Sequence, residues 1–216
     1  MPDNIDALGR EAIEHLTLKH NARERALPKS RTAIRYCANS IRATHRQDFH
    51  TAEELLTQAA RLLAEMKIDL QDHQDIYYAG FVQDAQKEYA EAATFAALTC
   101  HHPLPSAEEL AVGWSSYLNG LGEAVGELRR YVLDQLRHGH FAACEVYLRY
   151  MDDIYALLIT IDYPDAVTSG LRRTTDTTRG ILEKTRGDLT TAVTQAHLQQ
   201  SMEALQEALI RYKNEQ

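Results

Sequence analysis

Apolar residues recur at helical spacing along most of the chain, and this periodicity limits the possible folds more than any other feature. In the stretch 114–137 the apolar positions form one stripe at 100° per residue: Leu118, Leu121, Val125, Leu128 and Val132. No segment alternates apolar and polar residues between turn residues, as a half-buried strand does. Proline (5) and glycine (10) are scarce among the 216 residues, so few positions interrupt a helix. The sequence therefore predicts an all-α protein of about seven helices.

The helix start and stop signals fit one domain spanning residues 1–216. The expected helices are 5–46 (kinked or divided at Pro28), 51–66, 75–100, a short one capped by Ser106 and Glu109, 114–137, 141–161, and a long one from Pro164 to about Tyr212. Apolar side chains on the 141–161 helix lie on more than one side of it. A monomer does not tolerate this much apolar surface exposed to water. We therefore expect a closed homo-oligomer. The apolar positions concerned are Val146, Leu148, Met151, Ile154, Leu157, Leu158 and Ile161.

Cysteine usage and hydropathy exclude several classes of protein. Cys37, Cys100 and Cys144 are far apart and form neither a CxxC pair nor a Cys/His cluster, which argues against a disulfide framework or a structural zinc. The acidic N-terminus does not resemble a signal peptide, and no run approaches the ~20 apolar residues that cross a bilayer. We expect a cytoplasmic protein that has no membrane partner.

Positive charge is concentrated in one segment of an otherwise acidic chain. The net charge is −8, yet the stretch 19–46 carries eight Lys or Arg residues and a single acid, Glu24. Such a segment is typical of a surface that faces anions, and Arg31, Arg35, Arg42 and Arg46 are the candidate RNA-binding residues. The alternative is a solvated face whose cations pair with acids from other helices.

Glu88 and Glu91 lie within an apolar, alanine-rich stretch of the 75–100 helix. Glu88 falls on the same stripe as Phe81, Ala85, Ala92, Phe95 and Ala96, where an uncompensated carboxylate is costly. Glu91 follows one turn later, and carboxylates at i and i+3 suit joint coordination of a hard divalent ion. The alternative is a helix rotated so that both side chains face water.

A second carboxylate pair, Glu123 and Glu127, lies on the 114–137 helix at i and i+4. Small residues surround this pair (Gly120, Gly122, Ala124 and Gly126) and would let another helix approach closely. Two such helices could converge on one or two Mg²⁺ or Mn²⁺ ions, which prefer oxygen ligands. The two glutamates also lie opposite the apolar stripe, so exposure to solvent is the alternative.

Four motifs, in this order, resemble those of the translin family, and most closely its catalytic branch, translin-associated factor X and the archaeal translin-like proteins. They cover roughly residues 23–189, and their combined order and spacing are more specific than any one of them. The motifs are Ser30-Arg31 with Ile34, Ile41-Arg42 and His45-Arg46; Gln86-Lys87-Glu88-Tyr89-Ala90-Glu91-Ala92 with Phe95; Tyr117-Leu118 and Gly120 with Glu123, Gly126-Glu127-Leu128 and Arg130; and Asp162-Tyr163-Pro164 with Gly170-Leu171-Arg172-Arg173, Asp176, Arg179 and Glu183-Lys184-Thr185-Arg186-Gly187.

The resemblance implies an all-helical protein that assembles into a hollow, usually eight-subunit shell holding single-stranded RNA or DNA. In the catalytic branch four acidic side chains bind Mg²⁺ and cut RNA; they map onto Glu88, Glu91, Glu123 and Glu127. Two departures stand out. The family commonly has aspartate at the position of Glu123, and here one residue is inserted after Gln86. The resemblance thus implies a metal-dependent endoribonuclease, a hydrolase that uses Mg²⁺ or Mn²⁺.

Two other readings of the acidic pairs remain. One is a translin-like shell that binds single-stranded RNA or DNA without cutting it, favoured if Glu88 or Glu123 points away from the others. The other is a carboxylate-bridged di-iron bundle, which generally needs Glu-x-x-His on two helices, a motif that this sequence lacks. His45, His138 and His140 are the candidate general acids for cleavage, although such histidines are more often found at surfaces and helix ends.

Overall fold

Every regular element among residues 4–214, the part of the chain that the computed structural model describes, is an α-helix. The all-α prediction is therefore confirmed, with eight helices in these residues. They are α1 (Ile5–His45), α2 (Phe49–Asp69), α3 (Gln74–Tyr77), α4 (Gly80–Thr99), α5 (Trp114–Arg137), α6 (Phe141–Ile159), α7 (Asp165–Thr168) and α8 (Leu171–Asn214).

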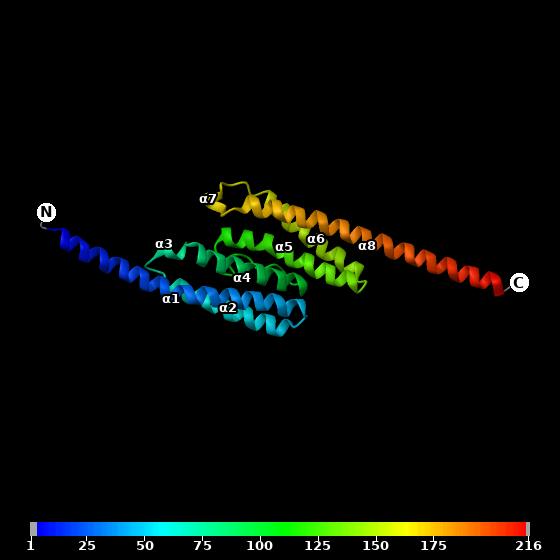
Figure 1. Ribbon diagram of the computed structural model, residues 1–216, viewed down its shortest axis with the longest axis horizontal. Helices are drawn as coiled ribbons and strands as arrows, with labels where there is room; N and C mark the ends of the chain where they lie inside the picture. Colours follow the sequence, from blue (N-terminus) through cyan, green and yellow to red (C-terminus); the bar gives the residue numbers. More distant parts are fainter. Residues whose placement is uncertain (1–3, 215–216) are drawn as a thin grey trace.

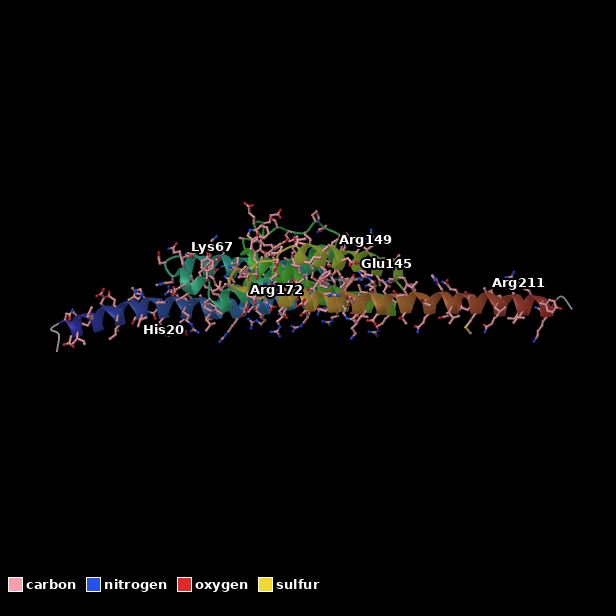
Figure 2. The ribbon with its side chains drawn as sticks, turned by 90° about the horizontal axis from the view of Figure 1, so that it is seen from above. His20, Lys67, Glu145, Arg149, Arg172 and Arg211 are labelled. Carbon is pink, nitrogen blue, oxygen red and sulfur yellow. The ribbon has the colours of Figure 1, made fainter. Side chains whose placement is uncertain are left out.

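The helices form two layers (Figure 1). The first consists of α1, α4, α5 and α8, which lie side by side in this order and run in the same direction. In the second layer α2 packs on α1 and α4, and α6 packs on α5 and α8, both running in the opposite direction. Figure 2 shows Lys67 of α2 and Arg149 of α6 on the side away from α1 and α8. One face of the four-helix row is therefore not covered by the second layer.

The apolar stripe predicted for 114–137 forms the centre of the core. All five of its residues on α5 are buried, and they pack with Phe95, Met151 and Leu158 from α4 and α6. A smaller cluster joins α1, α2 and α4 through Ala22, Ala26, Met66, Leu70, Ile76, Val82 and Ala85. Burial of these side chains holds the row of helices against the second layer.

Two glycines on α5 set the distances to its neighbours in the row. A Cβ at Gly120 would lie 2.7 Å from the Lys87 carbonyl oxygen and 2.9 Å from the Glu91 nitrogen, both on α4. A Cβ at Gly122 would lie 2.4 Å from Cγ2 of Thr174 on α8. The expected close approach of another helix to these glycines is confirmed. It brings the backbone of α4 against that of α5 at the level of the glutamates.

Four local predictions were wrong. Ser106 and Glu109 exchange the two hydrogen bonds of a capping box, but Ala111 takes a left-handed φ of 53° and no helix follows. The expected 75–100 helix breaks after Tyr77 into α3 and α4, and the last helix is preceded by the separate turn α7. Pro28 was expected to kink or divide the first helix, and the expectation of a division was wrong, because α1 continues through this residue.

The reason given for self-association was also wrong. Of the seven apolar residues, six lie on α6 and Ile161 follows its end; four are buried against α5 and α8, and of the seven only Leu157 is highly exposed. Exposed apolar side chains gather instead on the two long ends of α1 and α8, which project in opposite directions beyond the other helices (Figure 1). They are Ile5, Leu8, Ile13, Leu16 and Leu18 on α1, and Leu198, Met202, Leu205, Leu209 and Ile210 on α8. Between residues 4 and 214 no helix has the length and apolar character needed to cross a membrane.

Candidate metal and nucleic-acid site

Glu88, Glu91 and Glu123 converge where α4 passes α5. Each offers a carboxylate oxygen, and these oxygens all lie within 4.8 Å of one another. Two adjacent turns of α4 supply Glu88 and Glu91, and the contact at Gly120 brings α5 close enough for Glu123 to reach them. Glu88, Glu91 and Glu123 therefore do not point away from one another, which was the alternative. Such a group of oxygen atoms could hold a divalent metal ion.

The electrostatics of the group are those of crowded, partly desolvated acids. Glu91 is buried, and burial followed by the neighbouring Glu88, Glu123 and Glu127 raises its pKa to about 8. Burial, and then the charge of Glu123, also raises the pKa of Glu88. Each of these carboxylates would ionise more readily if a cation were bound beside it.

Lys87 is the cation that the structure places at this group. Its Nζ lies 2.7 Å from Oε1 of Glu123, and both side chains are partly buried. Burial lowers the pKa of Lys87, but the bond with Glu123 outweighs it and the pKa is raised. Sequence reasoning treated Lys87 only as an inserted residue. Its i,i+4 relation to Glu91 was the available signal that it lies on the same side of α4.

Glu127 is close to the group but has a different partner. Its Oε2 lies 2.5 Å from Nε2 of His45 at the end of α1. This hydrogen bond lowers the pKa of Glu127, so the carboxylate is ionised and accepts the bond from Nε2–H. His45 is largely buried beside Phe95, with ring centroids 4.7 Å apart, and its Nδ1 has no partner. The histidine thus orients Glu127.

His138 and His140 lie elsewhere. They follow the end of α5 with their rings stacked at 6.0 Å, eleven and more residues beyond Glu127. At a rise of about 1.5 Å per residue, this places them roughly 16 Å further along the helix. The structure therefore removes them as candidate general acids for this group.

The residues present fit a hard divalent ion. Carboxylate oxygens are the ligands that Mg²⁺ and Mn²⁺ prefer, and the three glutamates supply them from two rigid helices. The nearby thiol of Cys37 is not a competing soft ligand. Burial, and then the charges of Glu88 and Glu91, raises the pKa of Cys37 to about 12, so it stays protonated. The group also contains no histidine, unlike the di-iron alternative.

The basic segment divides into paired and unpaired cations. Lys19 pairs with Asp75, Arg23 with Glu24, and Lys29 with both Glu65 and Asp69. For Lys19 and Lys29 the alternative of pairing with acids from other helices is correct, whereas Arg23 pairs with its neighbour on α1.

The four candidate arginines behave differently. Arg31, Arg35 and Arg42 are exposed and lie within about 40° of one another around α1, and Arg46 follows as its C-cap. None has a carboxylate partner among residues 4–214; Arg42 donates only to the Asn39 amide oxygen, at 2.6 Å. We call these four residues the arginine stripe. His45, the partner of Glu127, lies between Arg42 and Arg46 in the sequence and about 60° from Arg42 around α1.

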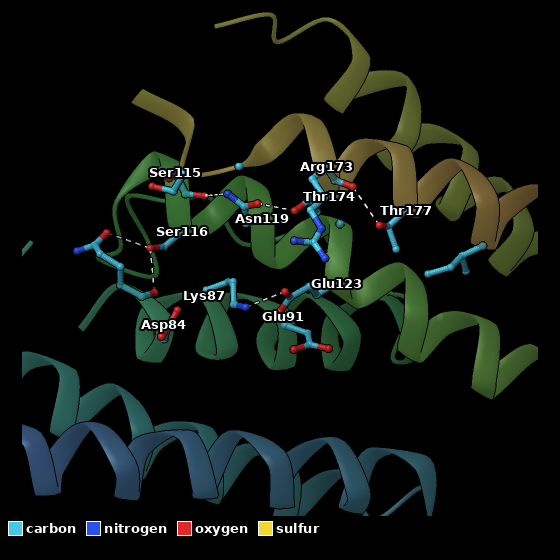
Figure 3. A pocket seen from close by; sticks show the side chains of 15 residues that line it. Asp84, Lys87, Glu91, Ser115, Ser116, Asn119, Glu123, Arg173, Thr174 and Thr177 are labelled. Atoms are coloured by element: carbon cyan, nitrogen blue, oxygen red, sulfur yellow. Dashed lines mark hydrogen bonds and ion pairs between the residues drawn. The ribbon is translucent and has the colours of Figure 1, made fainter. Parts of the chain in front are cut away.

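A pocket of about 630 Å³ adjoins the carboxylates and was not predicted (Figure 3). Glu91 and Glu123 form part of its wall, and the remainder comes from α4, from the first turns of α5 and from the start of α8. Hydroxyl and amide groups dominate the lining, and Arg173 projects into it from α8. Nothing in the spacing of the sequence indicates that the start of α8 faces α4 across a pocket, so the position of Arg173 could not be foreseen.

The fold and the site first define a class: an all-helical protein that gathers glutamates from two parallel helices beside a polar pocket. The chain belongs to the translin family, whose model matches residues 3–186, as the resemblance predicted. The uncharacterized protein MJ0175 of Methanocaldococcus jannaschii is 32% identical over 196 residues, covering 90% of this chain and 86% of that protein.

Solved structures agree with this membership. The structure of AfC3PO in complex with duplex RNA is 32% identical, with a TM-score of 0.79 over 86% of this chain and 96% of that chain. A crystal structure of AfC3PO is 33% identical, with the same TM-score and coverage. Apo-NeC3PO, at 22% identity and a TM-score of 0.76 over 89% of this chain and 98% of that chain, shares the fold.

Proposed function

We propose that this protein is a metal-dependent endoribonuclease that cuts single-stranded RNA inside a hollow oligomeric shell. The observation that carries the proposal is the convergence of Glu88, Glu91 and Glu123 within 4.8 Å. Membership of the translin family and the likeness to AfC3PO bound to duplex RNA support RNA as the ligand. Single-stranded DNA would bind through the same kind of contact, because its backbone also carries phosphates.

Glu88, Glu91 and Glu123 would hold Mg²⁺ or Mn²⁺. The bound ion would supply an activated water as nucleophile and would neutralise charge on the attacked phosphate. Lys87, which binds Glu123 in this structure, would have to give up this bond for Glu123 to hold the ion, and its positive charge would then be available to the RNA phosphate. Glu127 is outside the group of three and is kept ionised and oriented by His45, so it is the carboxylate we assign to accept a proton.

The arginine stripe would guide the RNA to this site. Its exposed guanidinium groups have no carboxylate partners, so they are available to phosphates in a salt-dependent and sequence-independent way. Without such cations the glutamates would repel the RNA backbone. Support for this role comes from His45, which follows Arg42 on α1 and binds Glu127.

The shell itself is proposed from the exposed apolar ends of α1 and α8. These ends bury nothing within one chain, and association with other copies would remove them from water. By resemblance the assembly is a homo-octamer, and we expect it in the cytoplasm. Light scattering at micromolar concentration tests this: a mass near 24.5 kDa would contradict the shell.

A second candidate function is a translin-like shell that binds RNA or DNA and does not cut it. The observation that favours it is the occupation of two glutamates by other side chains of the protein, Glu123 by the Lys87 ammonium and Glu127 by the His45 ring. In this case other side chains of the protein would hold the acidic group, and its role would be structural. Metal binding and cleavage would then be absent, while RNA binding through the arginine stripe would persist.

Glutamine variants separate the two functions. Glu91→Gln, Glu123→Gln and Glu127→Gln each remove a charge and nearly preserve shape, with exposed Glu108→Gln as the matched control. For a nuclease, cleavage of single-stranded RNA should fall on the order of 10²–10⁴-fold where a proton-transferring carboxylate is lost. The rise in melting temperature caused by Mn²⁺ should also shrink. Cleavage at the control level by all three variants would end the assignment.

A further inference from the structure

The pocket beside the carboxylates has two chemically different ends. Glu91, Glu123 and Arg173 lie at one end in Figure 3, and Asp84 and Ser115 lie at the other. Asp84 precedes Glu91 by seven residues on α4, which is about 10 Å at 1.5 Å per residue. Ser115 precedes Glu123 by eight residues on the parallel helix α5. The pocket therefore extends from the proposed metal-binding group toward the N-terminal ends of these helices.

Arg173 differs from three other arginines on the same part of α8. Arg172, Arg179 and Arg186 each bind a carboxylate, namely those of Asp162, Glu183 and Asp152. Arg173 has no carboxylate partner within residues 4–214, and its guanidinium points from α8 toward Glu123 and Lys87 (Figure 3). Arg173 faces Glu91 and Glu123 from the opposite wall of the pocket. A phosphate between Arg173 and a cation on the glutamates would be neutralised from both sides.

The opposite end requires a different ligand group. The Asp84 carboxylate is exposed and has no cation bonded to it, so it repels a second phosphate and accepts hydrogen bonds from hydroxyl or amino groups. Ser115 adds a hydroxyl to the same end. Most other polar groups in the wall are already bonded: Asn119 to Thr174 and to the Thr168 carbonyl, and Ser116 to Gln83. The ligand should be anionic at one end and a neutral hydrogen-bond donor at the other.

We propose that this pocket binds one nucleotide of the RNA, the one adjoining the phosphodiester that is cut. Arg173 contacts its phosphate, and its sugar and base extend toward Ser115 and Asp84. A volume of about 630 Å³ lies within the range of sites for small ligands, roughly 300–1,000 Å³. The inference rests on the proposed function, and it names the part of the substrate that the site recognises beyond the cleaved bond.

Binding of mononucleotides to the full-length protein tests the proposal without any cleavage. Adenosine and uridine 5′-monophosphate are titrated calorimetrically with and without Mg²⁺, and inorganic phosphate is the reference. We expect the mononucleotides to bind more tightly than phosphate. Arg173→Gln should weaken binding about tenfold or more, which is the scale of one charge-assisted contact. Arg172→Gln, the neighbouring arginine that is held by Asp162, is the matched control.

Asp84→Asn distinguishes a nucleotide pocket from a simple anion site. It should change the affinity for mononucleotides and leave phosphate unaffected at moderate salt. Equal mononucleotide affinities of the Arg173→Gln and Arg172→Gln proteins would overturn the proposal, and so would phosphate binding as tightly as a mononucleotide. Failure of the proposed nuclease is seen separately, because metal-dependent melting would then be lost while Arg173-dependent binding persists.

Discussion

The ammonium of Lys87 and a carboxylate oxygen of Glu123 lie 2.7 Å apart across the interface of α4 and α5. The same Glu123 is one of the three carboxylates that could hold a metal ion. Lys87 therefore compensates part of the negative charge of the group and competes with any divalent cation for the same oxygen atoms. The ion pair also connects the two helices that supply the site.

Replacement of Lys87 should make this competition visible. Lys87→Met keeps the length of the side chain and removes its charge, so Mn²⁺ should bind severalfold more tightly. In the absence of metal the glutamates lose a compensating charge, and the melting temperature should fall. Isothermal calorimetry and thermal melting measure the two effects, with Lys67→Met on α2 as control. Unchanged Mn²⁺ affinity would contradict the competition.

The raised pKa of Glu91 makes metal-free stability depend on pH. Burial, followed by Glu88, raises this pKa from 4.5 to about 8, so the folded protein keeps a proton that the unfolded chain releases. The folded state binds more protons between these values, and the free energy of unfolding should fall as the pH rises from about 4.5 to 8. Glu91→Gln should flatten this dependence and be the more stable protein at pH ~8.

Urea unfolding in EDTA at several pH values measures this effect. The difference should reach a few kcal/mol, because one pKa unit corresponds to about 1.4 kcal/mol. Glu108→Gln, at an exposed position, should keep the wild-type dependence. A wild type whose stability is constant from pH ~5 to ~8 would show that Glu91 is not held in its neutral form.

The glycine contact between α4 and α5 predicts a pair of opposite effects. Gly120→Ala would place a Cβ 2.7 Å from the Lys87 carbonyl oxygen, and it should destabilise the fold by about 1–3 kcal/mol through overpacking. At Gly126 the nearest atom to such a Cβ is 4.0 Å away. Gly126→Ala should therefore be neutral or stabilising by about 0.5–1 kcal/mol. Chemical denaturation of both variants, with equal stabilities as the contradicting result, checks the contact.

Charge reversal in the arginine stripe should weaken RNA binding. Arg42→Glu with Arg46→Glu removes two candidate phosphate contacts, and each lost contact lowers the log–log salt slope by about 0.7 for single strands. Fluorescence titrations of single-stranded RNA at several salt concentrations give the slope. Arg61→Glu, on α2 in the second layer, is the control. A double variant that folds well and keeps the wild-type slope would assign these arginines a role other than phosphate binding.

The parts of the structure that depend on local spacing were predictable. The α5 stripe follows from its 3.6-residue period, and spacing also puts Glu88 and Glu91 on adjacent turns of one helix, although it left open whether they face water. The resemblance to the translin family supplied the pairing of the two helices, which spacing alone does not give. The unpaired state of the arginine stripe could not be read from the sequence, since it depends on where distant acids lie.

The wrong predictions concern features that are determined by tertiary contacts. The Ser106 and Glu109 capping signal was present, but the loop after it turns back before a helix can form. The apolar residues of α6 pack against two helices at once. The wide apolar surface of α6 therefore reflects its burial against α5 and α8. Arg173 was quoted only as part of a motif, because only the folded chain brings the start of α8 opposite α4 across the pocket.

The parallel row of α1, α4, α5 and α8 has a consequence for biosynthesis. Parallel neighbours cannot be joined by short turns, so contacts across the row link residues far apart in the chain, such as His45 with Glu127, 82 positions later. Contacts of this kind form late, after the cost of closing long loops has been met. On the ribosome α1 and α2 can pair early, whereas the acidic group awaits α5 and the pocket awaits the start of α8. A nascent chain therefore lacks the acidic group until α5 has been made, and it lacks the pocket until the start of α8 has followed.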